Sequence, residues 1–165
     1  MSAIPSLKRY VLGFIFDSYK FGDKQERFVS VLLERKQRPA WQAGKLNGVG
    51  GKIELGESPF EAMHRECKEE TTLDIRDWVE YGEIVGPDFS VRLFYTVSDL
   101  YRIPYESPDE PLLIMHLCDL YEHENMFVNH ALPCIVGAIA HHNTRNFDMI
   151  LRFKVPDEKT LDMFE

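Results

Sequence analysis

The sequence is poor in cysteine, and the spacing of its few cysteines argues against two kinds of stabilised fold. Cys67, Cys118 and Cys134 are odd in number, lie far apart and show none of the usual metal-ligand spacings. A disulfide framework needs an even and denser set, and a structural zinc site needs closely spaced ligands. Free thiols are typical of a reducing compartment, so we expect a cytoplasmic protein.

Basic residues are also scarce, because 19 Lys and Arg residues face 27 Asp and Glu residues and leave a net charge of −8. Proteins that bind DNA or RNA without sequence preference carry a basic surface. We therefore expect no nucleic acid partner. A nucleotide remains compatible with this charge, since bound cations can supply the positive charge that a polyphosphate needs.

Long apolar runs are missing as well. A membrane-spanning helix needs ~20 apolar residues, and no stretch approaches that length. The apolar run 10–16 follows Lys8 and Arg9 like the start of a signal peptide, but Asp17 ends it and no small-residue cleavage site follows. We expect this run to be the first strand and expect no membrane partner.

The remaining chain indicates one domain that covers residues 1–165, without repeats, low-complexity tracts or a linker. Helices separated by a mixed set of strands predict an α/β sandwich, with a sheet covered by helices on both faces. Loops are expected at 38–51 and 104–111. The expected helices are 59–71 and 131–142, and the expected strands are 10–17, 28–35, 52–54, 79–85, 90–100, 112–117 and 147–155.

The start of the first helix carries its own signals. Ser58 followed by Glu61 is a capping box, and Pro59 occupies the first helical position, where its missing N–H costs nothing. An apolar stripe at three- and four-residue spacing is expected to pack into the core. Its members are Phe60, Met63 and Cys67, with Ala62 beside them.

The polar face of the same helix carries Arg65 and three glutamates, Glu66, Glu69 and Glu70, at spacings that bring the carboxylates side by side. Carboxylates so close repel one another unless cations lie between them. Mg²⁺ prefers such oxygen ligands and pairs with substrate phosphates. We interpret the face as a metal site for phosphate chemistry, whereas a solvated charged face is the ordinary alternative.

The segment 51–73 resembles the Nudix box, whose pattern is G-x5-E-x7-R-E-U-x-E-E-x-G-U, where U is an aliphatic residue. Cys67 stands at an aliphatic position, and Thr72 departs from the pattern, which has glycine there. Glycine would suit a left-handed helix end, which a β-branched residue adopts reluctantly. The matching residues are Gly51, Glu57, Arg65, Glu66, Glu69, Glu70 and Leu73.

The resemblance implies a Nudix-type α/β/α sandwich and assigns roles to single residues. Metal ligands would be the Gly50 carbonyl and the carboxylates of Glu66, Glu69 and Glu70, holding Mg²⁺ or Mn²⁺ as a substitute. Arg65 would orient carboxylates such as Glu57, and water would be the nucleophile. The proton acceptor would be a box glutamate such as Glu69 or a later acid, for which we favour Glu110 over Glu106 and Asp109.

Residues outside the box would select the substrate. The run 45–52 looks like that of the mutator-type branch, in which an asparagine at the position of Asn47 contacts a purine; a simple Asn-Gly turn is an equal alternative. Arg35 and Lys36 could contact phosphates or be exposed strand-end charges, and we also assign Lys52 to substrate binding. Core packing is favoured over base stacking for Trp41, Phe89 and Phe127.

The sequence therefore predicts a Mg²⁺-dependent pyrophosphohydrolase acting on a nucleoside diphosphate linked to another group. A nucleoside or deoxynucleoside triphosphate, including an oxidised purine, is the favoured substrate, giving a monophosphate and pyrophosphate. ADP-ribose, a dinucleoside polyphosphate or a nucleotide sugar is the first alternative. A non-catalytic nucleotide sensor is the second. Nudix relatives are often homodimers. No zinc site is expected at His141 and His142, because neighbouring helical residues diverge by about 100°.

Overall fold

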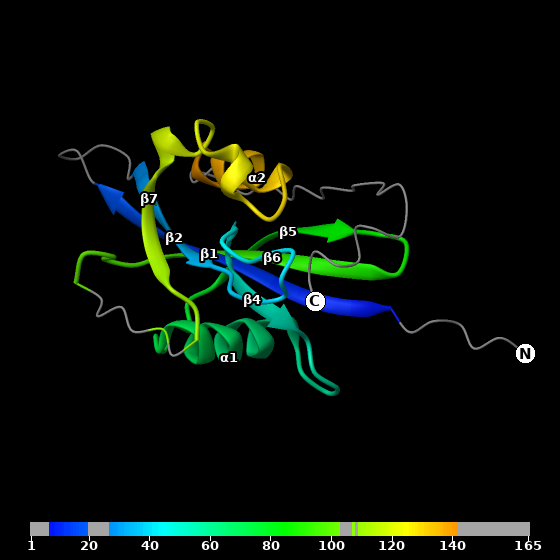
Figure 1. Cartoon of the computed structure of the whole chain (residues 1–165). Coiled ribbons are helices and arrows are strands. Elements are labelled where there is room, and N and C mark those ends of the chain that lie inside the picture. Colours follow the sequence, from blue (N-terminus) through cyan, green and yellow to red (C-terminus); the bar gives the residue numbers. More distant parts are fainter. Residues whose placement is uncertain (1–6, 20–26, 103–106, 108, 142–165) are drawn as a thin grey trace, which may run out of the picture.

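The computed structural model describes residues 7–19, 27–102, 107 and 109–141 (Figure 1). In these residues one mixed sheet carries a helix on each face, α1 (Pro59–Thr71) on one side and α2 (Ala131–His141) on the other. The α/β sandwich predicted from the sequence is confirmed. The expected strand 147–155, the turn residues 20–26, and residues 104–106, 108 and 142 lie outside the described residues.

The sheet runs in the order β3-β2-β1-β6-β5, with β4 paired to β1 and β7 paired to β2. Only the β1–β6 pair is parallel among these described pairings. The strands are β1 (Lys8–Tyr19), β2 (Arg27–Arg35), β3 (Leu46–Asn47), β4 (Val49–Lys52), β5 (Val79–Val85), β6 (Phe89–Val97) and β7 (Leu112–His116). Short 3-10 turns follow β7 at Leu117–Asp119 and Glu124–Met126.

The central strand β1 shows why both faces of the sheet are covered. Alternate side chains of a strand point to opposite faces. Leu12 and Phe14 belong to the core cluster that contains the buried residues of α2, whereas Val11 and Ile15 belong to the cluster that contains those of α1. A strand buried on both faces has the near-continuous apolar run seen at 10–16.

Helix α1 has the predicted bounds and the predicted capping box. Glu61 N donates to Ser58 Oγ at 3.2 Å, and Ser58 N donates to a Glu61 carboxylate oxygen at 2.8 Å. Thr72 follows the helix in the left-handed conformation, with φ 63°. Phe60 is an error in the predicted core stripe, because it is 48% exposed, although its ring edge meets the buried Phe94 ring.

The glycine-bearing segment before the helix differs most from expectation. A loop to residue 51 and a strand at 52–54 were expected, but β4 covers Val49–Lys52 and pairs with β1. Gly50 makes this possible, because a Cβ there would lie 2.1 Å from the Val11 carbonyl oxygen. The backbone of β4 thereby lies directly against β1.

Smaller boundary differences leave the architecture unchanged. Strand β6 ends at Val97, before the predicted residue 100, and β5 has the predicted bounds. No helix among the described residues is long and apolar enough to cross a membrane.

Candidate active site

A pocket of about 260 Å³ lies between β1, β4, α1 and residues 36–47, which connect β2 to β4. Strand β1 contributes Tyr10, Val11 and Leu12 to its lining. The other lining residues are two carboxylates, two cations, two amides and two glycines. These are Glu66 and Glu70, Lys36 and Arg38, Gln42 and Asn47, and Gly50 and Gly51.

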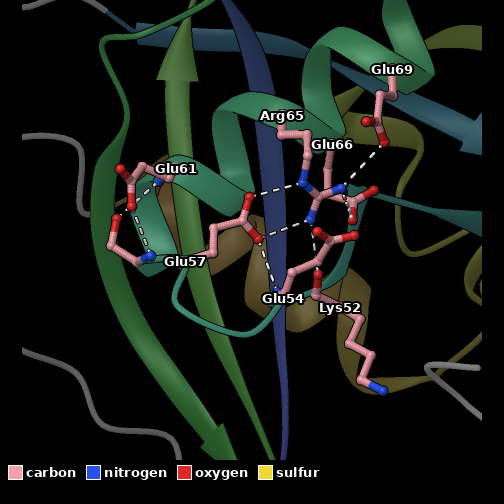
Figure 2. Close-up of polar contacts among 8 residues, drawn as sticks. Lys52, Glu54, Glu57, Glu61, Arg65, Glu66 and Glu69 are labelled. Carbon is pink, nitrogen blue, oxygen red and sulfur yellow. Dashed lines mark hydrogen bonds and ion pairs between the residues drawn. The ribbon is translucent and has the colours of Figure 1, made fainter.

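Arg65 organises the carboxylate face of α1 (Figure 2). Its guanidinium donates to both oxygens of Glu57 at 2.8 and 3.0 Å, and to Glu66 at 2.8 Å and Glu69 at 3.2 Å. A further N–H donates to the Lys52 carbonyl at 3.0 Å, which ties the helix to β4. Hydrogen bonding to Arg65 lowers the pKa of Glu57. Arg65 thus holds three carboxylates in one arrangement.

The box glutamates have different surroundings. Glu70 accepts a hydrogen bond from Gly50 N at 2.9 Å, and burial raises its pKa to about 8 despite that bond and the nearby Lys36. Burial also raises the pKa of Glu66, against the opposing effect of Arg65. The side chain of Glu69 is 60% exposed. Glu66 and Glu70 are therefore partly desolvated at the pocket, whereas the exposed Glu69 does not line it.

The donor chemistry of this pocket fits a hard divalent cation. Within the described part of the chain, no three His, Cys, Asp or Glu side chains are grouped as a ready-made metal site. Carboxylates and backbone nevertheless meet closely, because a Cβ on Gly51 would lie 2.5 Å from the Glu66 carboxyl carbon. Carboxylate and carbonyl oxygens are the ligands that suit Mg²⁺ and Mn²⁺. Glu66, Glu70 and the neighbouring Gly50 backbone are the best placed of the predicted ligands.

Beside the pocket, Glu34, Lys36 and Glu110 form a buried network. Lys36 Nζ lies 2.8 Å from Glu110 and 3.3 Å from Glu34. Burial and the Glu70 charge raise the pKa of Glu34 to about 9, against the opposing effect of Lys36. Burial opposes ionisation of Glu110, but Lys36 and the Gln37 N–H outweigh it and lower its pKa. A neutral Glu34 and an ionised Glu110 therefore surround the lysine.

Of the predicted substrate residues, Asn47 lines the pocket, and Arg35 and Lys52 do not. Asn47 Oδ1 accepts from Gly48 N at 2.9 Å. Asn47 and Gly48 do not form a hairpin turn, since the strands on either side pair with different neighbours. The Lys52 side chain points away from the carboxylates (Figure 2).

Glu110 is only 7% exposed and does not line the pocket. It lies next to the pocket, because it contacts Lys36, which does line it. Its proton-accepting role stays a prediction. The expected core packing is confirmed for Phe89 and Phe127. It is wrong for Trp41, which is 43% exposed and also lies outside the pocket lining.

Two pocket residues, Arg38 and Gln42, were not anticipated from the sequence. Gln42 is 2% exposed, which is unusual for a polar residue in a segment predicted to be a loop. A turn at 38–44, in which Gln42 N donates to the Pro39 carbonyl, carries both residues to the pocket. The one sequence signal for these residues was the cluster of Arg and Lys at 35–38, which favours binding of an anion.

Comparison with known proteins agrees with this geometry. The chain matches the family model of the NUDIX domain over residues 15–127, which is more than half of its length. A NUDIX hydrolase from Nitrosomonas europaea has a TM-score of 0.65 at 18% identity, over 91% of this chain and 80% of that chain. The mutator MutT protein from Bacillus halodurans has a TM-score of 0.60 at 20% identity, over 90% of each chain. A MutT structure from work on Aliivibrio salmonicida and Vibrio cholerae has a TM-score of 0.58 at 19% identity, over 79% and 96%.

Proposed function

Because the chain belongs to the Nudix family of hydrolases, we propose that it cleaves a phosphoanhydride bond in a nucleoside diphosphate linked to another group. A nucleoside or deoxynucleoside triphosphate is the proposed substrate, with a monophosphate and pyrophosphate as products. The observation that carries the proposal is the pocket itself, in which Glu66 and Glu70 face the same space as Lys36 and Arg38. Carboxylates suit cations, and Lys and Arg suit phosphate oxygens.

Mg²⁺ is the proposed cofactor, with Glu66, Glu69, Glu70 and the Gly50 carbonyl as its ligands. When bound, such cations neutralise charge on the phosphates and lower the pKa of an attacking water. The desolvation of Glu66 and Glu70 supports this assignment, since buried neighbouring carboxylates are stabilised by a cation.

The remaining residues would orient groups and move a proton. Arg65, held by Glu57, would fix the carboxylates of Glu66 and Glu69. Glu69 is better placed than Glu110 to accept a proton, because its side chain is exposed, whereas both oxygens of Glu110 are already in contact with donors. Catalysis of this reaction depends mostly on positioning and charge stabilisation, which matches these roles.

The cations and amides of the pocket would bind the substrate. Lys36 stays a proposed phosphate contact and Arg38 replaces Arg35, because Lys36 and Arg38 line the pocket. Asn47 would contact the base with its amide N–H group, since its oxygen already accepts a bond from Gly48 N. Lys52 remains a weaker proposal, because its side chain points away from the carboxylates (Figure 2).

A substrate panel tests the proposal. The purified protein would be incubated with Mg²⁺ or EDTA and with normal and 8-oxo purine triphosphates, pyrimidine triphosphates, ADP-ribose and diadenosine polyphosphates, and products would be separated by chromatography. We expect Mg²⁺-dependent release of a monophosphate and pyrophosphate from one triphosphate. Cleavage of ADP-ribose or a dinucleotide alone would refute the substrate, and binding without cleavage of any compound would indicate a sensor.

A further inference from the structure

A buried carboxyl group on β2 has no part in the function proposed above. Glu34 is 2% exposed and lies in the middle of the sheet, opposite Asn47 of β3 on one side and Leu112 of β7 on the other. Burying a carboxyl group destabilises a protein unless hydrogen bonds compensate for the lost water. The compensating group here is Lys36, which donates to Glu34 Oε2 at 3.3 Å.

These contacts converge on the lysine. Lys36 Nζ lies 3.3 Å from Glu34 Oε2 and 2.8 Å from Glu110 Oε2. A lysine side chain is long and flexible, so one contact does not define its position. Two carboxyl groups from different parts of the chain therefore restrict the ammonium group to one place.

Glu110 also fixes the backbone that follows the lysine. Its other carboxylate oxygen accepts from Gln37 N at 2.9 Å and from Arg38 N at 3.4 Å. Glu110 N in turn donates to Ser107 Oγ at 2.9 Å. Glu110 therefore holds both the Lys36 ammonium group and the backbone at the start of the turn that carries Arg38.

Lys36 is the member of this network that reaches the pocket. It lines the pocket together with Glu70, whereas Glu34 and Glu110 do not. Its side chain is 16% exposed, against 3% for Glu34 and 9% for Glu110. The two carboxyl groups thus support the lysine from the protein side and leave one side of its ammonium group toward the pocket.

We propose that Glu34 is a positioning residue that acts with Glu110 to hold the Lys36 ammonium group at the pocket wall, where Lys36 binds the polyphosphate of the substrate. The inference rests on the proposed function only in taking a polyphosphate as the ligand. Glu34 itself touches no substrate and acts through Lys36. Its removal therefore affects phosphate binding only while Lys36 is present.

Binding of inorganic tripolyphosphate with Mg²⁺, measured by isothermal titration calorimetry, tests this without any turnover. K36M is expected to weaken binding about tenfold to a hundredfold, because a charged hydrogen-bonding contact is lost. E34L keeps the side-chain volume but makes no hydrogen bond, and should weaken binding about threefold to tenfold. E34Q can still accept from Lys36, and should bind like the native protein. The double variant E34L/K36M should match K36M.

Several results would overturn the inference. They are native affinity in folded E34L, additive losses in E34L/K36M, and no binding of tripolyphosphate by the native protein. Thermal unfolding monitored by circular dichroism checks that each variant folds. If E34L does not fold, E34A in the native and K36M backgrounds supplies the same comparison, with a loss expected only in the native background. The expected pattern in a protein that cleaves no nucleotide would refute the proposed function and leave this inference standing.

Discussion

The acidic residues of α1 are close in sequence but are not equivalent in the structure. Glu70 is half-buried and accepts from Gly50 N, so it joins the helix to β4. Glu69 is exposed and contacts only Arg65 among the hydrogen bonds described. Glu61 faces the solvent at the helix start and serves the capping box. Equal chemical changes at these positions should therefore have unequal effects.

Replacing Glu70 with Gln should lower kcat about a hundredfold to a thousandfold at saturating Mg²⁺, because an amide cannot supply the anionic oxygen ligand that a carboxylate gives to the proposed cation. Glu61→Gln is the matched control on the same helix, since glutamine also completes a capping box. Its kcat should stay within about twofold of the native value. Initial rates on the nucleotide that the native protein cleaves provide the measurement. A near-native kcat for Glu70→Gln would remove Glu70 from the metal ligands.

Single residues of the site were predictable where spacing alone determines their neighbours. Arg65 and the box glutamates lie on one helix, so helical geometry predicts their contacts. The contrast between Arg35 and Lys36 was not predictable, because a one-residue change moves a side chain to the other face of a strand. The pocket side is fixed by the pairing of β2 with β3 and by Glu110, which lies far away in the sequence.

At the scale of elements, α1 has favourable signals at its start and an unfavourable residue at its end. The capping box satisfies the first N–H groups. Thr72, at the end, adopts φ 63° with an exposed side chain. The left-handed region costs a residue with a Cβ about 1–2 kcal/mol. The conformation of Thr72 therefore makes the C-terminal end of α1 less stable than it would be with glycine at this position.

Thr72→Gly should stabilise the protein by about 0.5–1 kcal/mol, because the relief of left-handed strain exceeds the extra entropy of glycine in the unfolded chain. Urea unfolding monitored by circular dichroism gives the free energy of unfolding. Thr72→Ala is the control, since alanine keeps the Cβ and should give no such gain. Equal stabilisation by both substitutions would mean that the threonine side chain, rather than the backbone conformation, destabilises the helix end.

The elements show where local sequence patterns suffice and where they fail. Helix α1 and strand β5 were predicted within their observed bounds, because capping residues and apolar runs define them locally. The glycine-bearing strand β4 looked like a loop, since glycine is disfavoured in strands. Its pairing depends on the close approach of Gly50 to β1, a contact between distant segments that no local pattern encodes.

At the scale of the whole molecule, the site forms where the apolar core beneath α1 borders the acidic face of that helix. Helix α1 packs its apolar face on the odd-numbered residues of β1 and turns its acidic face toward the pocket. The chain carries a net charge of −8, so this concentration of carboxylates adds to a general repulsion. A cation that binds only the folded protein should reduce that repulsion and stabilise the fold.

Mg²⁺ should therefore raise the Tm of the native protein. A ligand at a hundred times its Kd stabilises the folded state by about 2.7 kcal/mol, which corresponds to a shift of about 5–10 °C for a chain of this size. Differential scanning calorimetry in Mg²⁺ and in NaCl of equal ionic strength separates binding from screening, because NaCl screens charges without occupying the pocket. The shift specific to Mg²⁺ should shrink in Glu70→Gln and persist in Glu61→Gln. If NaCl reproduces the whole effect, stabilisation arises from the net charge of the molecule, and the carboxylates of α1 do not form a cation site.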